Sequence, residues 1–262
     1  MEKSVAIEKN LQEELDGLLI DSIDRLGVGT DRSDRRIPER FQRYMQNLLE
    51  YNSHTNLTAI TDPREIYVKH FVDSISSLLS LEYLKDRYEV DYETKRFIDV
   101  GTGAGFPSVP VKIMRPMIDL TLLDSLEKRT RFLKQLSEGL ELSGITILHQ
   151  RAEDAARQKE HREVYDIVLS RAVANLPVLL EYCLPFIRKG GYMICLKGPS
   201  IDEELVKSKK ALKLLGGELV EVLSVTIPFS DLDHKIAIFR KIKNTDGKYP
   251  RKAGRPSKEP LV

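Results

Sequence analysis

The chain has few cysteines and no long apolar run, and each absence excludes a class of protein. Its 262 residues contain two cysteines, Cys183 and Cys195, both in apolar settings, so a secreted disulfide scaffold is excluded and a reducing cytoplasm fits. No apolar stretch approaches the roughly 20 residues that a bilayer helix needs. The opening MEKSVAIEKN is charged from its second residue, so we expect no secretory signal. These features predict a globular, cytoplasmic protein without a membrane partner.

Charge is unevenly distributed, although the formal net charge is only +1. From Arg240 to Val262 there are eight Lys or Arg and two Asp or Glu, a local charge of +6. Subtracting these from the 41 basic and 40 acidic residues of the chain leaves 33 and 38, a charge of −5. A basic tail on a mildly acidic body indicates a polyanionic partner, and a solvated tail that only aids solubility explains it equally well.

The first 85 or so residues have helical patterning. Apolar residues recur at helical spacing in three segments, 7–19, 41–49 and 71–79. A polar linker over 27–37 separates the first two, and Pro38 can open the second helix because the first helical position needs no N–H donor. Asp62, Pro63 and Glu65 form a start of the capping-box kind before the third. We predict a small helical module over residues 1–85.

Residues 86–242 alternate between short apolar runs and helix-patterned segments. The first five runs are 96–100, 119–124, 145–150, 165–171 and 192–198, a pattern typical of buried parallel strands and their crossover helices. Two more, 218–227 and 234–242, are separated by PFSDLD, which is too short for a parallel crossover and predicts an antiparallel pair. The pattern predicts an α/β domain with a seven-stranded, mostly parallel sheet and one antiparallel strand, followed by a basic tail over 243–262.

The most distinctive local feature is a glycine-rich turn after the first predicted strand. In FIDVGTGAGFP, residues 97–107, a strand runs into three alternating glycines and then into a helix. Glycine permits positive φ and the close approach of a ligand, and such a turn places that ligand across the carboxyl edge of the sheet. Asp124, 19 residues beyond Gly105 at the end of the second strand, can accept hydrogen bonds from both hydroxyls of a ribose.

Two cofactors compete for this turn, a nicotinamide dinucleotide and S-adenosylmethionine. Dinucleotide sites usually show G-x-G-x-x-G, whereas here the third glycine comes one residue early and Phe106 follows it. An aromatic residue at that position suits an adenosyl or methionyl group and is a poor opening for a pyrophosphate. The spacing therefore favours S-adenosylmethionine, with an NAD-dependent oxidoreductase as the alternative.

Polar residues near the ends of the next strands have two interpretations each. Glu153 could help to recognise an adenine, or could only begin the next helix, where an acid favours the positive end of the dipole. Arg171, at the end of the fourth strand, could contact a ligand or form an ion pair within the fold. The sequence leaves both alternatives open.

Seven segments of the chain, taken in order, resemble the RsmG family, formerly called glucose-inhibited division protein B. They are NLTAI (56–60), HFVDSI (70–75), FIDVGTGAGFPSVP (97–110), LLDSLEKRTRFL (122–133), RAED (151–154), LSRAVA (169–174) and LKG (196–198). The resemblance, over roughly residues 38–240, implies a Rossmann-like class I methyltransferase that transfers a methyl group from S-adenosylmethionine to N7 of one guanine in 16S rRNA. It implies cofactor binding at Gly101, Phe106, Asp124, Ala152, Glu153 and Arg171, and the glycine turn adds Gly103.

The implied chemistry needs no general base. Guanine N7 attacks with a lone pair and loses no proton, so catalysis consists chiefly of positioning and of desolvating a charged donor. No His/Asp or Cys/His pair occurs in the glycine-turn region, and the five histidines and two cysteines lack metal-ligand spacing. We therefore predict no catalytic side chain and no metal.

RNA has to be held by charge, with the target base exposed in a pocket. The candidate RNA contacts are His70, which the resemblance suggests, Lys128 and Arg129 at a helix start, Lys197 after the fifth strand, and Arg251, Lys252 and Arg255 in the tail. A solvated helix face explains the pair at 128–129 equally well. The expected partner is 16S rRNA or the small ribosomal subunit, and we expect a monomer. A non-enzymatic nucleic-acid-binding protein that acts through its tail is the third hypothesis.

Overall fold

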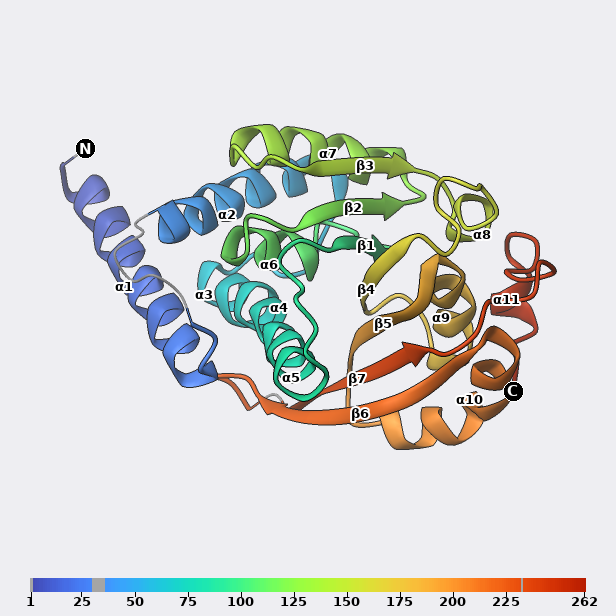
Figure 1. Ribbon diagram of the computed structural model, residues 1–262. Coiled ribbons are helices and arrows are strands. Elements are labelled where there is room, and N and C mark those ends of the chain that lie inside the picture. Colours follow the sequence, from blue (N-terminus) through green and yellow to red (C-terminus); the bar gives the residue numbers. More distant parts are fainter. Residues whose placement is uncertain (1, 30–35, 232) are drawn as a thin grey trace.

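A computed structural model describes the backbone of residues 2–29, 36–231 and 233–262, which form a central sheet covered by helices on both faces (Figure 1). The seven strands are β1 Arg96–Val100, β2 Asp119–Asp124, β3 Ile145–His149, β4 Tyr165–Arg171, β5 Ile187–Lys197, β6 Gly217–Thr226 and β7 Asp233–Lys241. Their order is β3-β2-β1-β4-β5-β7-β6. Strands β1 to β5 pair in parallel, and β7 is antiparallel to both β5 and β6. The predicted sheet with one reversed strand is confirmed.

Helices follow the strands in the predicted alternation. Those before the sheet are α1 Glu2–Leu26, α2 Arg36–Thr55, α3 Pro63–Ile66, a π-helical turn η1 Tyr67–Val72, α4 Asp73–Ile75 and α5 Leu78–Tyr88. Those after β1 are α6 Ser108–Met114, α7 Glu127–Gly139, α8 Ala152–Ala155, α9 Leu176–Cys183, the 3-10 turn η2 Leu184–Phe186, α10 Ile201–Leu215 and α11 Arg255–Lys258. No helix among the described residues is both long and apolar enough to cross a bilayer.

The sheet separates two apolar cores, and alternate residues of each central strand enter one or the other. In β1, Phe97 belongs to the core beneath α1, α2, α5, α6 and α7, whereas Ile98 and Val100 belong to the core beneath α9 and α10. In β4, Ile167 faces the first core and Val168 the second. Continuous apolar runs were expected of strands buried on both faces, and this packing is the reason for them.

The helices before β1 pack directly on the sheet. Tyr44 of α2 donates its hydroxyl to the carbonyl of Ala104 at 2.5 Å, within the glycine turn. A Cβ at Gly105, whose φ is +101°, would lie 2.6 Å from that same hydroxyl, so glycine is required there for space as well as for conformation. This contact joins α2 to the glycine-rich turn that the sequence analysis singled out.

Two details of the helix starts differ from expectation. Helix α2 begins at Arg36, two residues before Pro38, so the prediction that Pro38 opens this helix is wrong. The predicted linker at 27–37 falls partly outside the described residues. Asp62 caps α3 as predicted, since its Oδ1 accepts from the Glu65 amide at 2.9 Å. The Glu65 side chain pairs with Lys69 at 2.6 Å instead of closing a capping box.

The third predicted helix is divided by the π-helical turn Tyr67–Val72. A π turn inserts one extra residue and changes which side chains face a neighbouring element, and such turns are frequent at functional sites. His70 and Asp73 lie in and directly after it. The third segment therefore contributes polar side chains to the sheet edge as well as an apolar face.

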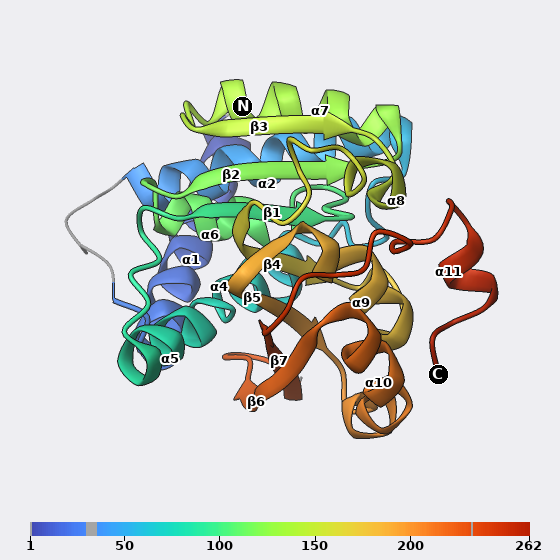
Figure 2. The same cartoon turned by 45° about the vertical axis from the view of Figure 1, so that its right-hand side comes forward.

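The C-terminal residues are folded onto the body of the protein. Tyr249 and Leu261 are buried with the core beneath α9. Figure 2 shows this segment running across α9 to reach α11 at the side of the molecule where β4 and α8 end. The +6 tail is therefore a docked part of the fold over its described length.

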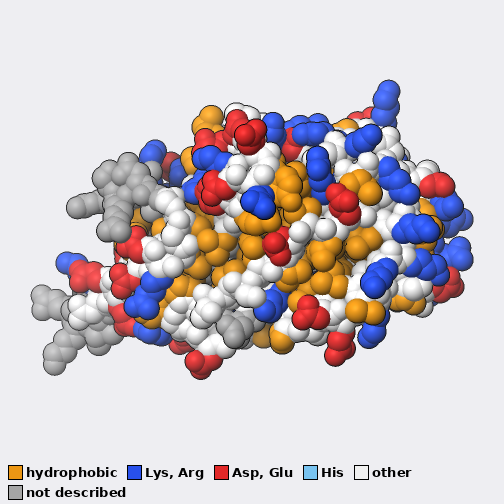
Figure 3. Space-filling view, turned by 60° about the horizontal axis from the view of Figure 1, so that its bottom comes forward, with side chains coloured by type: hydrophobic (Ala, Val, Ile, Leu, Met, Phe, Trp, Pro, Cys, Tyr) orange, Lys and Arg blue, Asp and Glu red, His pale blue; other side chains and the backbone are white. Residues whose placement is uncertain are grey.

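Strand β6 forms the lower edge of the sheet in Figure 1. Its side chains are only partly covered, and Leu219 is 42% exposed. Figure 3 shows that apolar side chains gather in the middle of this face, with charged side chains around them.

Candidate active site

A cavity of about 530 Å³ opens at the carboxyl ends of β1, β2 and β4. Its lining includes all seven positions predicted for the cofactor, namely Gly101, Gly103, Phe106, Asp124, Ala152, Glu153 and Arg171. Three strand ends, the glycine turn and the start of α8 supply these residues. Parallel strands bring their carboxyl ends to one edge of a sheet, which is why residues so far apart in the sequence meet here.

The glycine turn forms the floor of the cavity. Gly101 and Gly103 have φ values of +76° and +62°, in the left-handed region that favours glycine. The Gly101 amide donates to the Leu123 carbonyl at 2.9 Å, and the Thr102 hydroxyl donates to Asp99 Oδ2 at 2.9 Å. The turn is thus built by its own backbone and by Asp99 beneath it.

Asp99 is fully buried at the end of β1. Its Oδ2 is bound by Thr102, whereas its Oδ1 has no hydrogen-bond partner among the described residues. Burial raises the pKa of this carboxyl to about 7, although hydrogen bonds from Ser108 and Thr102 and the charge of Arg171 oppose the shift. Asp99 is not one of the residues that line the cavity, so it holds the turn from beneath.

Asp124 is buried at the end of β2, and its carboxylate faces the glycine turn. Oδ2 accepts from the Gly103 amide at 3.0 Å and from Arg129 Nη1 at 3.2 Å, and Oδ1 accepts from the Leu126 amide at 2.9 Å. Arg129, predicted as an RNA contact, therefore lies in the cavity wall, and its buried Nε has no hydrogen-bond partner among the described residues.

Phe106 is the centre of an aromatic and cationic cluster at one end of the cavity. The His70 ring stacks on it with centroids 4.6 Å apart, and the Tyr44 ring stacks at 5.3 Å. Arg171 places its guanidinium carbon 4.9 Å from the Phe106 centroid, a cation–π distance. His70 Nε2 lies 2.8 Å from the Thr58 hydroxyl, which also lines the cavity.

Arg171 forms the ion pair that was one of its two alternatives, and it also borders the cavity. It lines the cavity, and its Nη1 donates to Asp73 Oδ2 at 2.6 Å and to the Lys69 carbonyl at 3.2 Å. Asp73, 3% exposed in its side chain, also binds His234 Nδ1 through Oδ1. One buried carboxylate therefore joins the helices before β1, the end of β4 and the start of β7.

Comparison with known proteins shows which family this chain is similar to. The family model described as rRNA small subunit methyltransferase G matches residues 37–232. A ribosomal RNA small subunit methyltransferase G of Alkaliphilus oremlandii is 51% identical over 235 residues, 90% of this chain and 95% of its own. One of Acetivibrio thermocellus is 48% identical over 255 residues, 97% and 99% of the two chains.

The chain belongs to this family.

Solved structures support the fold. A SAM-dependent methyltransferase of Aquifex aeolicus superposes with a TM-score of 0.51 at 15% identity, over 71% of this chain and 97% of that one. A putative transferase of Pyrococcus horikoshii gives 0.50 at 13% identity, over 66% and 64%. The Rossmann-like class I methyltransferase fold that the RsmG resemblance implied is therefore confirmed.

The residues predicted to contact RNA are placed very differently from one another. Lys128 is exposed and donates to the Thr55 carbonyl at 2.6 Å, and Lys252 is exposed in the tail. Lys197 is 10% exposed in its side chain and donates to Glu204 at 2.8 Å and to the Ala174 carbonyl at 2.9 Å. Its ammonium therefore joins α10 to the loop before α9 and is not presented to solvent at the cavity edge.

The remaining candidates in the tail are engaged within the chain. Arg251 Nη2 binds Glu181 Oε2 at 2.7 Å, and Arg255, which is exposed, binds Glu259 at 3.1 Å. The structure also adds cavity-lining residues that the sequence did not indicate, Thr58, Tyr182, Gly254 and Ser257. Of these four residues, only Gly254 stood out in the sequence, as a glycine within the basic tail. Tyr182 reaches the cavity through the packing of α9, which the sequence does not reveal. No cluster of three or more possible metal ligands occurs among the described residues.

His70 is expected to remain neutral well below pH 6. Burial, and next the charge of Arg171, lowers the pKa of its imidazole to about 4 from the 6.5 of an unfolded chain. The unfolded state therefore binds a proton more readily at this side chain, and the contribution of His70 to the free energy of unfolding falls by on the order of 2 kcal/mol as the pH drops from about 6.5 to 4. Asp99, whose pKa is raised, contributes in the opposite direction over the same range, so the measurement is the difference in urea denaturation between the unchanged protein and His70→Gln at each pH. A difference that stays constant across this range would contradict the assignment.

Proposed function

We propose that this chain transfers a methyl group from S-adenosylmethionine to N7 of a guanine in 16S rRNA. The observation that carries the proposal is the cavity at the carboxyl edge of the sheet, because it collects all seven positions expected of a donor site in a chain of the rRNA small subunit methyltransferase G family. We further propose that the enzyme works in the cytoplasm as a monomer, on 16S rRNA or the small ribosomal subunit.

The residues of the cavity fit an adenosyl sulfonium donor. The cradle at Gly101 and Gly103 lets a ligand approach the backbone closely, and Arg129, which lines the cavity, has a buried Nε without a hydrogen-bond partner among the described residues. Asp124 would hold the ribose hydroxyls, and Ala152 and Glu153 the adenine. When bound, the donor supplies an electrophilic methyl group on a positively charged sulfur.

The Phe106 end of the cavity suits the acceptor. The His70 ring, which stacks on Phe106 and lines the cavity with it, offers an aromatic surface against which a base can lie. With its pKa at about 4, His70 is neutral at pH 7 and adds no positive charge beside an attacking lone pair. Arg171 is fixed by Asp73, so its position is set before a substrate arrives. N7 loses no proton on methylation, so positioning and exclusion of water are what these residues contribute.

The test is methylation of 16S rRNA in small subunits from a strain that lacks this modification. Labelled S-adenosylmethionine should transfer label to the RNA, and borohydride reduction followed by aniline should cleave the chain at one 7-methylguanosine. Label at another atom would overturn the N7 assignment and keep the enzyme class. Stabilisation of the protein by NAD and not by adenosyl compounds would favour the oxidoreductase hypothesis, which the family membership does not support.

A further inference from the structure

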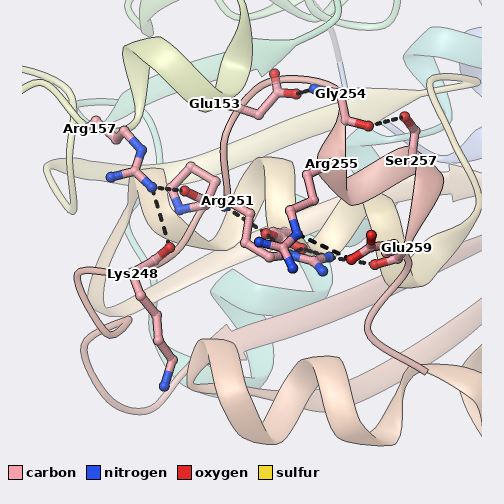
Figure 4. A network of polar contacts seen from close by, with 10 residues as sticks. Glu153, Arg157, Lys248, Arg251, Gly254, Arg255, Ser257 and Glu259 are labelled. Atoms are coloured by element: carbon pink, nitrogen blue, oxygen red, sulfur yellow. Dashed lines mark hydrogen bonds and ion pairs between the residues drawn. The ribbon is translucent and has the colours of Figure 1, made fainter.

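The last 15 residues, Lys248–Val262, form part of the cavity wall; we call this segment the C-terminal strap. Gly254 and Ser257 of the strap line the cavity together with Tyr182 of α9. The Gly254 amide donates to Glu153 Oε1 at 2.9 Å, and Figure 4 shows this bond joining the strap to the start of α8. The wall at the Glu153 end is thus completed by residues about 100 positions later in the chain.

A buried ion pair anchors the strap. Glu181 on α9 is fully buried, and Arg251 binds it in bidentate fashion, with Nε 2.9 Å from Oε1 and Nη2 2.7 Å from Oε2. The Arg251 amide also donates to Oε1 at 2.8 Å. Withdrawing Arg251 to a phosphate would leave a buried carboxylate uncompensated, which is strongly unfavourable. Arg251 is thus a structural anchor in this fold.

Further contacts hold the strap on both sides of Gly254. Arg162 Nη1 donates to the Tyr249 carbonyl at 2.9 Å, and Arg157 Nη2 donates to the Lys248 carbonyl at 3.3 Å. Beyond α11, Leu261 is buried against the core beneath α9. The segment between these fixed points crosses the cavity rim, so the position of Gly254 is determined by the fold.

We propose that the C-terminal strap is the adenine-side wall of the donor pocket and that Gly254 is a positioning residue for Glu153. This rests on the proposed function, because it takes S-adenosylmethionine as the ligand. Glu153 is buried, and the Gly254 N–H occupies one of its oxygens, which fixes the carboxylate. The other oxygen has no hydrogen-bond partner among the described residues and is left to accept from the exocyclic amino group of adenine. The strap thereby contributes to donor affinity and to the preference for adenine.

A phosphate anchor for RNA is the competing role for this segment. The structure favours the wall, because Arg251 and Arg255, two of the three strap residues that were predicted to contact RNA, are paired within the chain. Gly254 and Ser257 are the strap residues that line the cavity, and neither carries a charge. An uncharged wall of this kind recognises a ligand by shape and hydrogen bonding and adds no attraction for a phosphate.

Two variants of the full protein test the strap. Truncation after Lys252 removes Gly254 and Ser257 and keeps the Arg251–Glu181 pair. Gly254→Pro keeps the chain length but removes the N–H that binds Glu153 and forces φ away from +79°. Titration calorimetry with S-adenosylhomocysteine should show at least a tenfold loss of affinity for each variant, on protein that melting curves show to be folded. Lys258→Ala, an exposed change in the same helix, should bind like the unchanged protein.

Specificity gives a second measurement. The unchanged protein should bind S-inosylhomocysteine, which has an oxygen in place of the amino group, more weakly than S-adenosylhomocysteine. Truncation after Lys252 should reduce this difference in affinity between the two compounds. Full S-adenosylhomocysteine affinity in both variants, with loss of RNA affinity alone, overturns the inference in favour of a phosphate anchor. An unchanged protein that binds neither compound overturns the proposed function, and the strap's role with it.

Discussion

Gly101→Asp is expected to abolish binding of S-adenosylmethionine, with a loss of affinity of at least 100-fold. A Cβ at this position would lie 2.7 Å from Val173 Cγ2, and φ is +76°, a conformation that costs an L-residue about 1–2 kcal/mol. The new carboxylate would also stand in a cavity that already holds Asp124. Titration calorimetry with S-adenosylmethionine measures the effect.

Two controls separate the causes of that loss. Gly17→Asp makes the same substitution in α1, where a Cβ meets no atom within 4 Å, and should leave donor affinity unchanged. Gly101→Ala adds the strain and the overlap with Val173 without the charge, and should bind more weakly than the unchanged protein but better than Gly101→Asp. Unchanged affinity in Gly101→Asp would show that the donor binds elsewhere.

Arg171→Ala is expected to lower the free energy of unfolding by about 3 kcal/mol and to reduce methylation as well. The substitution removes the ion-pair partner at 2.6 Å from a carboxylate, Asp73, that is 3% exposed. Truncating one member of such a buried pair usually costs about 3–5 kcal/mol, and the remaining contact with His234 offsets part of that cost. Loss of the cation over Phe106 would also loosen the acceptor end of the cavity. Urea denaturation gives the stability change.

The matched control is another arginine–aspartate pair. Arg188 binds Asp166 at 2.7 Å, but its side chain is 47% exposed, so Arg188→Ala should cost less than about 1 kcal/mol. Arg171→Lys keeps the charge but not the planar fork and should recover part of the loss. Equal effects of Arg171→Ala and Arg188→Ala would contradict the role given to the Asp73 network.

The sheet could be predicted because its signals are local. Buried parallel strands appear as apolar runs, and the short segment PFSDLD between the last two strands permits only an antiparallel connection. The glycine turn was equally visible, since the spacing of its glycines reflects three positive φ values. Strand β5 begins at Ile187, five residues earlier than expected, because Arg188 to Gly191 look like a turn in the sequence although they continue the strand.

The rest of the site depends on pairings between distant residues. Nothing near Arg251 in the sequence indicates Glu181, 70 positions earlier, so a basic tail could not be distinguished from a docked one. Lys197 was a reasonable RNA candidate until the packing of α10 brought Glu204 within 2.8 Å of it. Arg129 likewise belongs to the cavity because α7 begins three residues after Asp124 and brings Arg129 back to its carboxylate. Charged residues show their partners only in three dimensions.

The position of β7 between β5 and β6 has a consequence for the order of events during synthesis. β6 is made before β7 but touches the sheet only through it, so β6 has no strand to pair with until β7 has left the ribosome. Until then the growing chain presents β5 as an open edge, with Met193 and Ile194 among its apolar residues. Such an edge is prone to pair with other chains. The reversed strand therefore leaves the β5 edge open to pairing with other chains until nearly the whole chain has been made.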